Sequence, residues 1–202
     1  MIRQLTLEDA NEFRELIIDM YSDLENLEWF SPMPFDIENV KGMISHPRFY
    51  IIGYFEDGVL KGVGSLDYKC GKLIGKIDLP EFSDPSKVVE LGFHMVHSKY
   101  KGNGIMKKLV NYLLNKIEED KFEIAFGKVH VNNLASSTSL IRNGFNIYSG
   151  YSKPVNKEEF INLSSQDFFS KRGKEHAKET LAKYSEEDEN VIVDYNILVK
   201  RI

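Results

Sequence analysis

The feature that most constrains this chain is a strand-like run that ends at a glycine-containing turn and is followed by an amphipathic helix. The run spans residues 88–96, the turn holds Gly102 and Gly104, and the helix begins near Ile105. Glycines let a backbone approach an anion closely, and a helix N-terminus supplies N–H groups and a positive potential. The turn is surrounded by four lysines: Lys99, Lys101, Lys107 and Lys108. The segment therefore predicts a site for a polyanion.

The rest of the chain alternates between strand-like and helix-like segments, which favours an α/β layer fold. We expect strands at residues 2–5, 49–55, 59–68, 88–96, 122–131, 145–151 and 191–199. Helices are expected at residues 7–24, from the cap at Asp36 to before Pro47, from Ile105 onward, and at 134–142. Residues 156–184 read as a helical insertion before the last strand, and residues 69–86 as a long connection. We expect one domain over residues 1–202.

Composition limits the function classes. The chain has 202 residues, 42% hydrophobic and 28% charged, which is typical of an ordinary globular protein. Its net charge of −5 argues against a dedicated nucleic-acid binder. The single cysteine, Cys70, excludes an intramolecular disulfide and fits a reducing compartment. Without a signal peptide or a membrane-spanning run, we expect a cytoplasmic monomer or homodimer that needs neither membrane nor nucleic acid.

Three blocks of sequence together resemble the GNAT (GCN5-related N-acetyltransferase) superfamily over roughly residues 1–150. The run Glu90–Val96 followed by Lys99-x-x-Gly102-x-Gly104 resembles its acyl-CoA-binding motif, with Lys99 where Gln or Arg is usual. Asn133-x-x-Ser136 and then Gly144-Phe145 resemble a second block, and residues 2–10 resemble the first strand and helix. The resemblance implies a mixed, mostly antiparallel sheet flanked by helices.

The resemblance also implies a binding site for acetyl-CoA, with no metal. Backbone groups near the end of the fourth strand would pair with the pantetheine arm, and the glycine turn would hold the diphosphate. The expected cofactor-binding residues are Met95, Val96, Lys101, Gly102, Asn103, Gly104, Ile105, Met106, Asn133 and Ser136. Asn133 could instead serve only as a helix cap.

Glu90 lies where many members of the superfamily hold a general base, and an amine must lose a proton before it attacks a thioester. A salt-bridged or solvated Glu90 is the alternative. Leu140 occupies the position at which relatives often hold a tyrosine that protonates the departing thiolate. Another hydroxyl would have to serve, and Tyr148 is the candidate acid among Ser136, Ser137, Ser139, Tyr148 and Tyr151; solvent is the other choice.

The remaining candidate residues also have purely structural interpretations. His94 and His97 flank the turn and could shuttle protons, although histidines near a strand end are more often polar surface residues. The aromatic and proline-rich segment at residues 28–35 would line the acceptor site or pack on its own core. Acidic residues near it, Glu25, Glu28 and Asp36, favour a cationic small molecule.

The sequence thus predicts an N-acetyltransferase that acts on a primary amine of a small molecule or peptide by direct attack. The alternative is a catalytically degenerate acyl-CoA-binding module that serves sensing or interaction.

Overall fold

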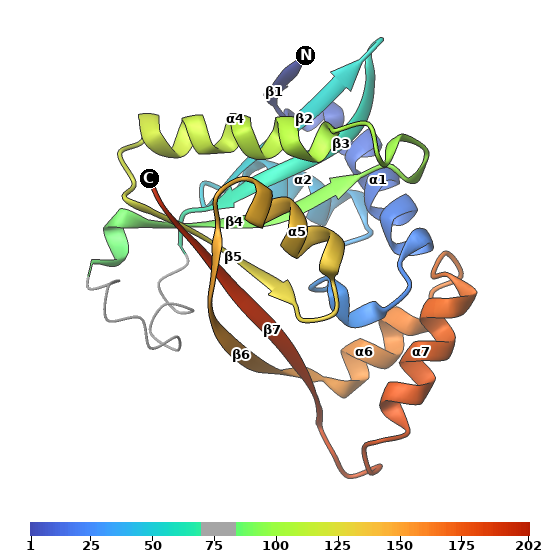
Figure 1. The fold of residues 1–202 in the computed structure, drawn as a ribbon. Helices are drawn as coiled ribbons and strands as arrows, with labels where there is room; N and C mark the ends of the chain where they lie inside the picture. Colours follow the sequence, from blue (N-terminus) through green and yellow to red (C-terminus); the bar gives the residue numbers. More distant parts are fainter. Residues whose placement is uncertain (70–83) are drawn as a thin grey trace.

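A computed structural model describes residues 1–69 and 84–202 of the chain. Its framework is a seven-stranded sheet with the order β1-β2-β3-β4-β5-β7-β6 (Figure 1). The strands are β1 (Ile2–Gln4), β2 (Phe49–Glu56), β3 (Val59–Asp67), β4 (Val88–Val96), β5 (Ile124–His130), β6 (Asn146–Asn156) and β7 (Asn190–Arg201). All neighbouring strands are antiparallel except β4 and β5, which are parallel. The predicted mixed, mostly antiparallel sheet flanked by helices is confirmed.

The helices cover both faces of the sheet. They are α1 (Ala10–Asp23), α2 (Ile37–Ser45), α4 (Ile105–Glu119), α5 (Leu134–Arg142), α6 (Lys157–Ser164) and α7 (Lys171–Leu181). Short 3-10 helices are η1 (Leu7–Asp9), η2 (Leu27–Trp29), η3 (Pro85–Lys87) and η4 (Ser98–Tyr100). Helices α4 and α5 pack on one face of the sheet in one apolar cluster, whereas α1, α2, α6 and α7 share a second cluster on the other.

Local sequence signals explain where several helices begin. Asp36 accepts a hydrogen bond from the N–H of Asn39 at 2.9 Å and caps α2. Asn156 caps α6 in the same way, through the N–H of Glu159 at 3.1 Å. Each side-chain oxygen satisfies an N–H group that the helix leaves without a partner. The predicted insertion at residues 156–184 contains α6 and α7.

The expected helix at residues 7–24 begins with the 3-10 turn η1 at residues 7–9 and continues directly as α1 from Ala10 to Asp23. The Arg3 guanidinium donates two hydrogen bonds of 2.7 Å to Asp9 and ties the helix start to β1. This pairing lowers the pKa of the Asp9 carboxyl to about 2.

The connection expected at residues 69–86 falls largely outside the described residues, and so does Cys70. Every helix in the described ranges is too short or too polar to cross a bilayer.

Candidate active site

The site lies where β4 and β5 separate. Their parallel pairing covers only three residue pairs and ends at Glu90 opposite Phe126. Beyond this point the strands enclose a cleft of about 310 Å³ that runs between the two faces of the sheet. Residues from α4 and α5 line one half of the cleft, and residues from η2, the loop after it and β2 line the other.

A bulge in β4 shapes the wall of this cleft. The register between β3 and β4 shifts between Gly64 and Leu66, so Gly92 and Phe93 crowd against Ser65. A Cβ on Gly92 would lie 2.5 Å from the Ser65 Oγ, so a larger residue there would force the Ser65 side chain to move. Bulges re-aim strands and release ladder hydrogen bonds. This one turns the end of β4 away from β5.

The glycine turn precedes α4 and leaves backbone N–H groups without partners among the described residues. Gly102 has φ +81° and Gly104 has φ +72°, a left-handed conformation that other residues adopt only at a cost. The first hydrogen bond of α4 runs from the N–H of Lys108 to the carbonyl of Gly104 at 3.2 Å. Within the described chain, the N–H groups of residues 102–107 therefore have no hydrogen-bond partner. Among these residues Met106 lines the cleft, and so does Val110, which follows it on α4.

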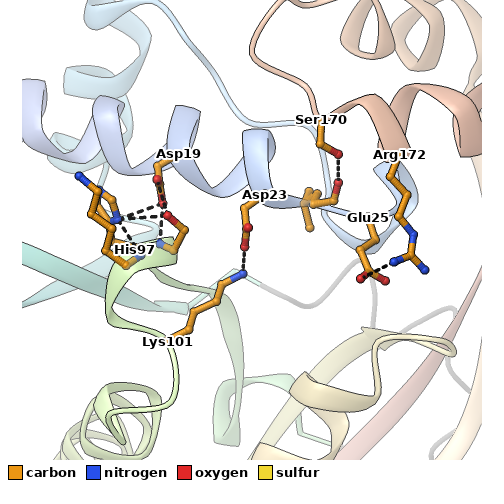
Figure 2. A network of polar contacts seen from close by, with 10 residues as sticks. Asp19, Asp23, Glu25, His97, Lys101, Ser170 and Arg172 are labelled. Atoms are coloured by element: carbon orange, nitrogen blue, oxygen red, sulfur yellow. Dashed lines mark hydrogen bonds and ion pairs between the residues drawn. The ribbon is translucent and has the colours of Figure 1, made fainter.

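The turn is fastened to helix α1 (Figure 2). The Asp19 carboxylate accepts hydrogen bonds from the N–H of Ser98 at 2.7 Å and from its hydroxyl at 2.8 Å, and lies 3.3 Å from Nδ1 of His97. One helical turn further on, Asp23 forms an ion pair with Lys101. The first contact fixes the backbone just before the turn, and the second holds a lysine side chain at its edge.

The opposite half of the cleft has aromatic walls. Trp29 and Phe30 come from η2 and the loop behind it, Phe49 from β2, and Tyr195 from β7. The loop is held against α1, because the Tyr21 hydroxyl donates to the carbonyl of Ser31 at 2.8 Å and Arg14 donates to the carbonyl of Phe35. This half can bind an apolar body.

Charged side chains converge on the floor of the same half. Glu90 lies opposite Asp67 of β3, and Arg48 forms a bidentate pair with Asp67. Lys128 lies two residues beyond Phe126 on β5, on the same face as Glu90. Burial raises the pKa of the Glu90 carboxyl to about 7, the Asp67 carboxylate adds to the rise, and the Lys128 ammonium opposes it. Glu90 can therefore exchange a proton near neutral pH.

The comparisons with known proteins agree with this geometry. The model of the acetyltransferase (GNAT) domain family matches residues 1–146, well over half of the chain. The chain belongs to the GNAT family. No curated protein sequence matches it significantly.

Solved structures of other GNAT proteins have the same fold over the whole chain. A ribosomal-protein-alanine N-acetyltransferase from Brucella melitensis is 16% identical and aligns with a TM-score of 0.66, covering 100% of this chain and 99% of its own. An N-acetyltransferase from Staphylococcus aureus is 13% identical, with a TM-score of 0.64 and coverages of 100% and 97%. A putative acetyltransferase from Salmonella typhimurium, solved with its cofactor acetyl-CoA, is 15% identical, with a TM-score of 0.63 and coverages of 100% and 92%.

Three of the predicted cofactor-binding residues, Met106, Asn133 and Ser136, line the cleft, and so does Glu90. Residues 101–104 form the exposed turn before α4, and Ile105 is the buried first residue of that helix. Met95 and Val96 end β4 beside the turn, with the Met95 side chain buried in the core. Asn133 does cap α5, since its Oδ1 accepts from the N–H of Ser136 at 3.1 Å. Its Nδ2 has no hydrogen-bond partner within the described residues, so capping leaves a donor for a ligand.

The expected acids lie in different places. Tyr148 is on β6, 40% exposed, and does not line the cleft. Ser136 and Ser139 line it together with Leu140, whereas Ser137 is buried. The tyrosine that lines the cleft is Tyr195, and burial raises its pKa to about 12.

The histidines differ from the surface interpretation. His94 lines the cleft with Nδ1 3.1 Å from the carbonyl of Gly92, and burial lowers its pKa to about 4, so the ring is neutral at pH 7. His97 caps η4. His130 and His176 both face Glu28, at 4.0 and 2.5 Å. In the described ranges no group of three or more His, Cys, Asp or Glu side chains could hold a metal.

The helical insertion supports the half of the cleft that has aromatic walls. Besides the His176–Glu28 contact, the Ser170 hydroxyl donates to the carbonyl of Leu24, and Arg172 pairs with Glu25 (Figure 2). The acidic residues that favoured a cationic substrate are thus engaged elsewhere: Glu25 and Glu28 bind α7, and Asp36 caps α2. None of the three lines the main cleft.

Sequence reasoning missed Arg48, Asp67, Lys128 and Tyr195. The one available signal was Lys128, a charged residue inside the otherwise apolar strand β5. The others become site residues only through the pairing of β3 with β4 and of β5 with β7.

Proposed function

We propose that this protein transfers an acetyl group from acetyl-CoA to a primary amine of a small molecule or peptide by direct attack. The observation that carries the proposal is a cleft lined both by Met106, which lies beside the N–H groups of the glycine turn that are unpaired within the described residues, and by the partly buried Glu90 carboxyl. Family membership supports acetyl transfer in general.

The residues at the turn fit a CoA diphosphate. The N–H groups of residues 102–107 lack partners in the described chain, point outward from a helix start, and are flanked by exposed lysines. In the proposal these groups hold the diphosphate. The end of β4 at Met95 and Val96, with the Asn133 Nδ2 and Ser136, holds the pantetheine arm. A relative with acetyl-CoA bound supports the same use of the fold.

Acetyl-CoA supplies a thioester: the amine nitrogen bonds to its carbonyl carbon, the C–S bond breaks, and the proton that the new amide nitrogen loses passes through water to the departing thiolate. Glu90 acts as the base that removes a proton from the bound ammonium group before attack. A pKa near 7 suits this task, because the carboxylate is populated at neutral pH and still basic enough to accept a proton. Backbone N–H groups at the end of β4 polarise the carbonyl.

No dedicated acid is required for the leaving group. A thiol with a pKa of about 8.5 leaves readily near neutral pH, so water can protonate it. Leu140 at the usual tyrosine position is compatible with this mechanism, and Tyr148 takes no part in it because it lies outside the cleft.

The test is acceptor-dependent release of CoA thiol. Purified protein is mixed with acetyl-CoA and a panel of amino acids, arylalkylamines and alanine-initiated peptides, and the products are verified by mass. We expect release with at least one acceptor and a loss of about 100-fold or more in Glu90→Gln at pH 7. Saturable acetyl-CoA binding without transfer to any acceptor would contradict the proposal and favour the binding-module alternative.

A further inference from the structure

Lys128 is an unusual group in the acceptor half of the cleft. It projects from the middle of β5 and is only partly exposed. Its ammonium lies 5.0 Å from the centre of the Tyr195 ring, a cation–π contact. In the part of the chain that the structure describes, it makes no hydrogen bond and no ion pair within 4.0 Å. The cleft therefore holds a cation without a direct anionic partner.

The charges around Lys128 do not neutralise it. Asp67 is already paired with Arg48. Glu90, whose strand separates from β5 just beyond this point, loses part of its charge because burial raises the pKa of its carboxyl to about 7. Burial lowers the pKa of the Lys128 ammonium, Glu90 opposes this shift, and Lys153 of β6 is a further cation that adds to the lowering. The floor of this half therefore carries an excess of positive charge.

A partly buried ammonium without a partner is unfavourable, and an anion that enters the cleft compensates it. The acidic side chains nearest the aromatic loop do not offer such compensation. Glu25 and Glu28 contact α7, and none of their oxygen atoms lines the main cleft. The compensating anion must then come with the ligand.

We propose that the acetyl acceptor carries a carboxylate or phosphate group in addition to its amine, and that Lys128 binds this anion. The proposal rests on the proposed function and refines it. The amine lies toward Glu90, which faces β5 at Phe126, two residues before Lys128. The apolar part of the acceptor lies against Trp29, Phe30 and Phe49. An aromatic amino acid is the simplest compound of this class.

The test uses ligands that cannot react. Protein saturated with CoA, which fills the donor half, is titrated calorimetrically with 3-phenylpropanoate, with its neutral amide 3-phenylpropanamide, and with 2-phenylethyl phosphate. We expect at least one of the two anions to bind tenfold or more tightly than the amide, and the better anion identifies the group. In Lys128→Met, which keeps most of the length of the side chain and removes its charge, this preference is lost. Lys178→Met, an exposed change on α7, keeps it.

Equal binding of amide and anions by the wild type, or an anion preference that survives in Lys128→Met, would overturn the proposal. The assay of acceptor-dependent CoA-thiol release, run on the same protein with acetyl-CoA, separates this result from failure of the proposed function. If the protein acetylates amines but shows no preference for anions, only the proposed anion site at Lys128 is wrong. If it prefers anions but transfers no acetyl group, only the proposed acetyltransferase function is wrong.

Discussion

At the scale of residues, the proposed acetyl transfer depends on Glu90. The carboxyl is held between a paired Asp67 and an unpaired Lys128, in a strand that leaves its neighbour just beyond it. The position of Glu90 was predictable from the motif that follows it. The raised pKa of its carboxyl was not predictable, because Glu90 is buried beside Lys128 and Asp67 only when β3, β4 and β5 come together in the folded chain.

The ratio of wild-type to Glu90→Gln activity should depend on pH in a defined way. Below pH 7 both kcat/KM values rise tenfold per pH unit, the wild type through the carboxylate fraction of Glu90 and the variant through the fraction of neutral amine, so their ratio stays constant. Above about pH 7 Glu90 is ionised and the wild type gains no more, whereas the variant continues to gain neutral amine, so the ratio falls. A ratio that stays constant from pH 5.5 to 8.5 would show that Glu90 is not the base.

At the scale of elements, the site depends on two supports that reach it from α1 and from the insertion. The local signals for α2, α5 and α6 predicted these helices well, since each starts at a capping side chain. The supports themselves were not predictable. Ser98 and Asp19 are 79 residues apart, and His176 and Glu28 are 148 apart, so only the folded chain brings them together.

Removing the Asp19 carboxylate should weaken the grip on the glycine turn. In Asp19→Ala the N–H and hydroxyl of Ser98 lose their acceptor, and we expect the KM for acetyl-CoA to rise several-fold with kcat nearly unchanged. Asp23→Asn is the matched control on the same helix. It frees Lys101 and removes a negative charge, so the KM for acetyl-CoA should fall slightly at low salt. Equal increases in both variants would argue against a positioning role for Asp19.

Loss of His176 should affect the acceptor rather than acetyl-CoA. Glu28 is buried with one oxygen unpaired, and His176→Ala removes the closest partner of the other oxygen. The loop that carries Trp29 and Phe30 should shift, and the KM for the acceptor should rise several-fold. Arg172→Met breaks only an exposed pair with Glu25 and should leave both KM values unchanged. Identical kinetics for His176→Ala and wild type would show that α7 does not support the loop.

At the scale of the whole molecule, the alternation of elements predicted the class of fold, and the family resemblance predicted the sheet. The crossing order at the end, in which β7 inserts between β5 and β6, follows from long-range pairing that no local pattern encodes. This insertion places Tyr195 beside Lys128. The acceptor half of the cleft was therefore the least predictable part.

Glu90 should also leave a signature in global stability. The raised pKa means that the folded protein binds the proton more tightly than the unfolded chain, whose carboxyl has the usual pKa of 4.5. This contribution is complete below pH 4.5 and is lost as pH rises through about 7. The wild type should therefore lose about 3 kcal/mol of unfolding free energy relative to Glu90→Gln across this window. Chemical denaturation at a series of pH values measures it, and parallel curves would contradict it.

The central claim is that acetyl-CoA binds at the glycine turn, and calorimetric titration tests it most directly. The wild type should bind acetyl-CoA saturably. Gly104→Asp should bind it at least tenfold more weakly, because the side chain strains a residue at φ +72° and repels the diphosphate. Gly58→Asp puts the same strain and charge at φ +77° in the β2–β3 turn and should bind like wild type. Wild-type protein that does not bind, or Gly104→Asp that binds equally well, would contradict the account.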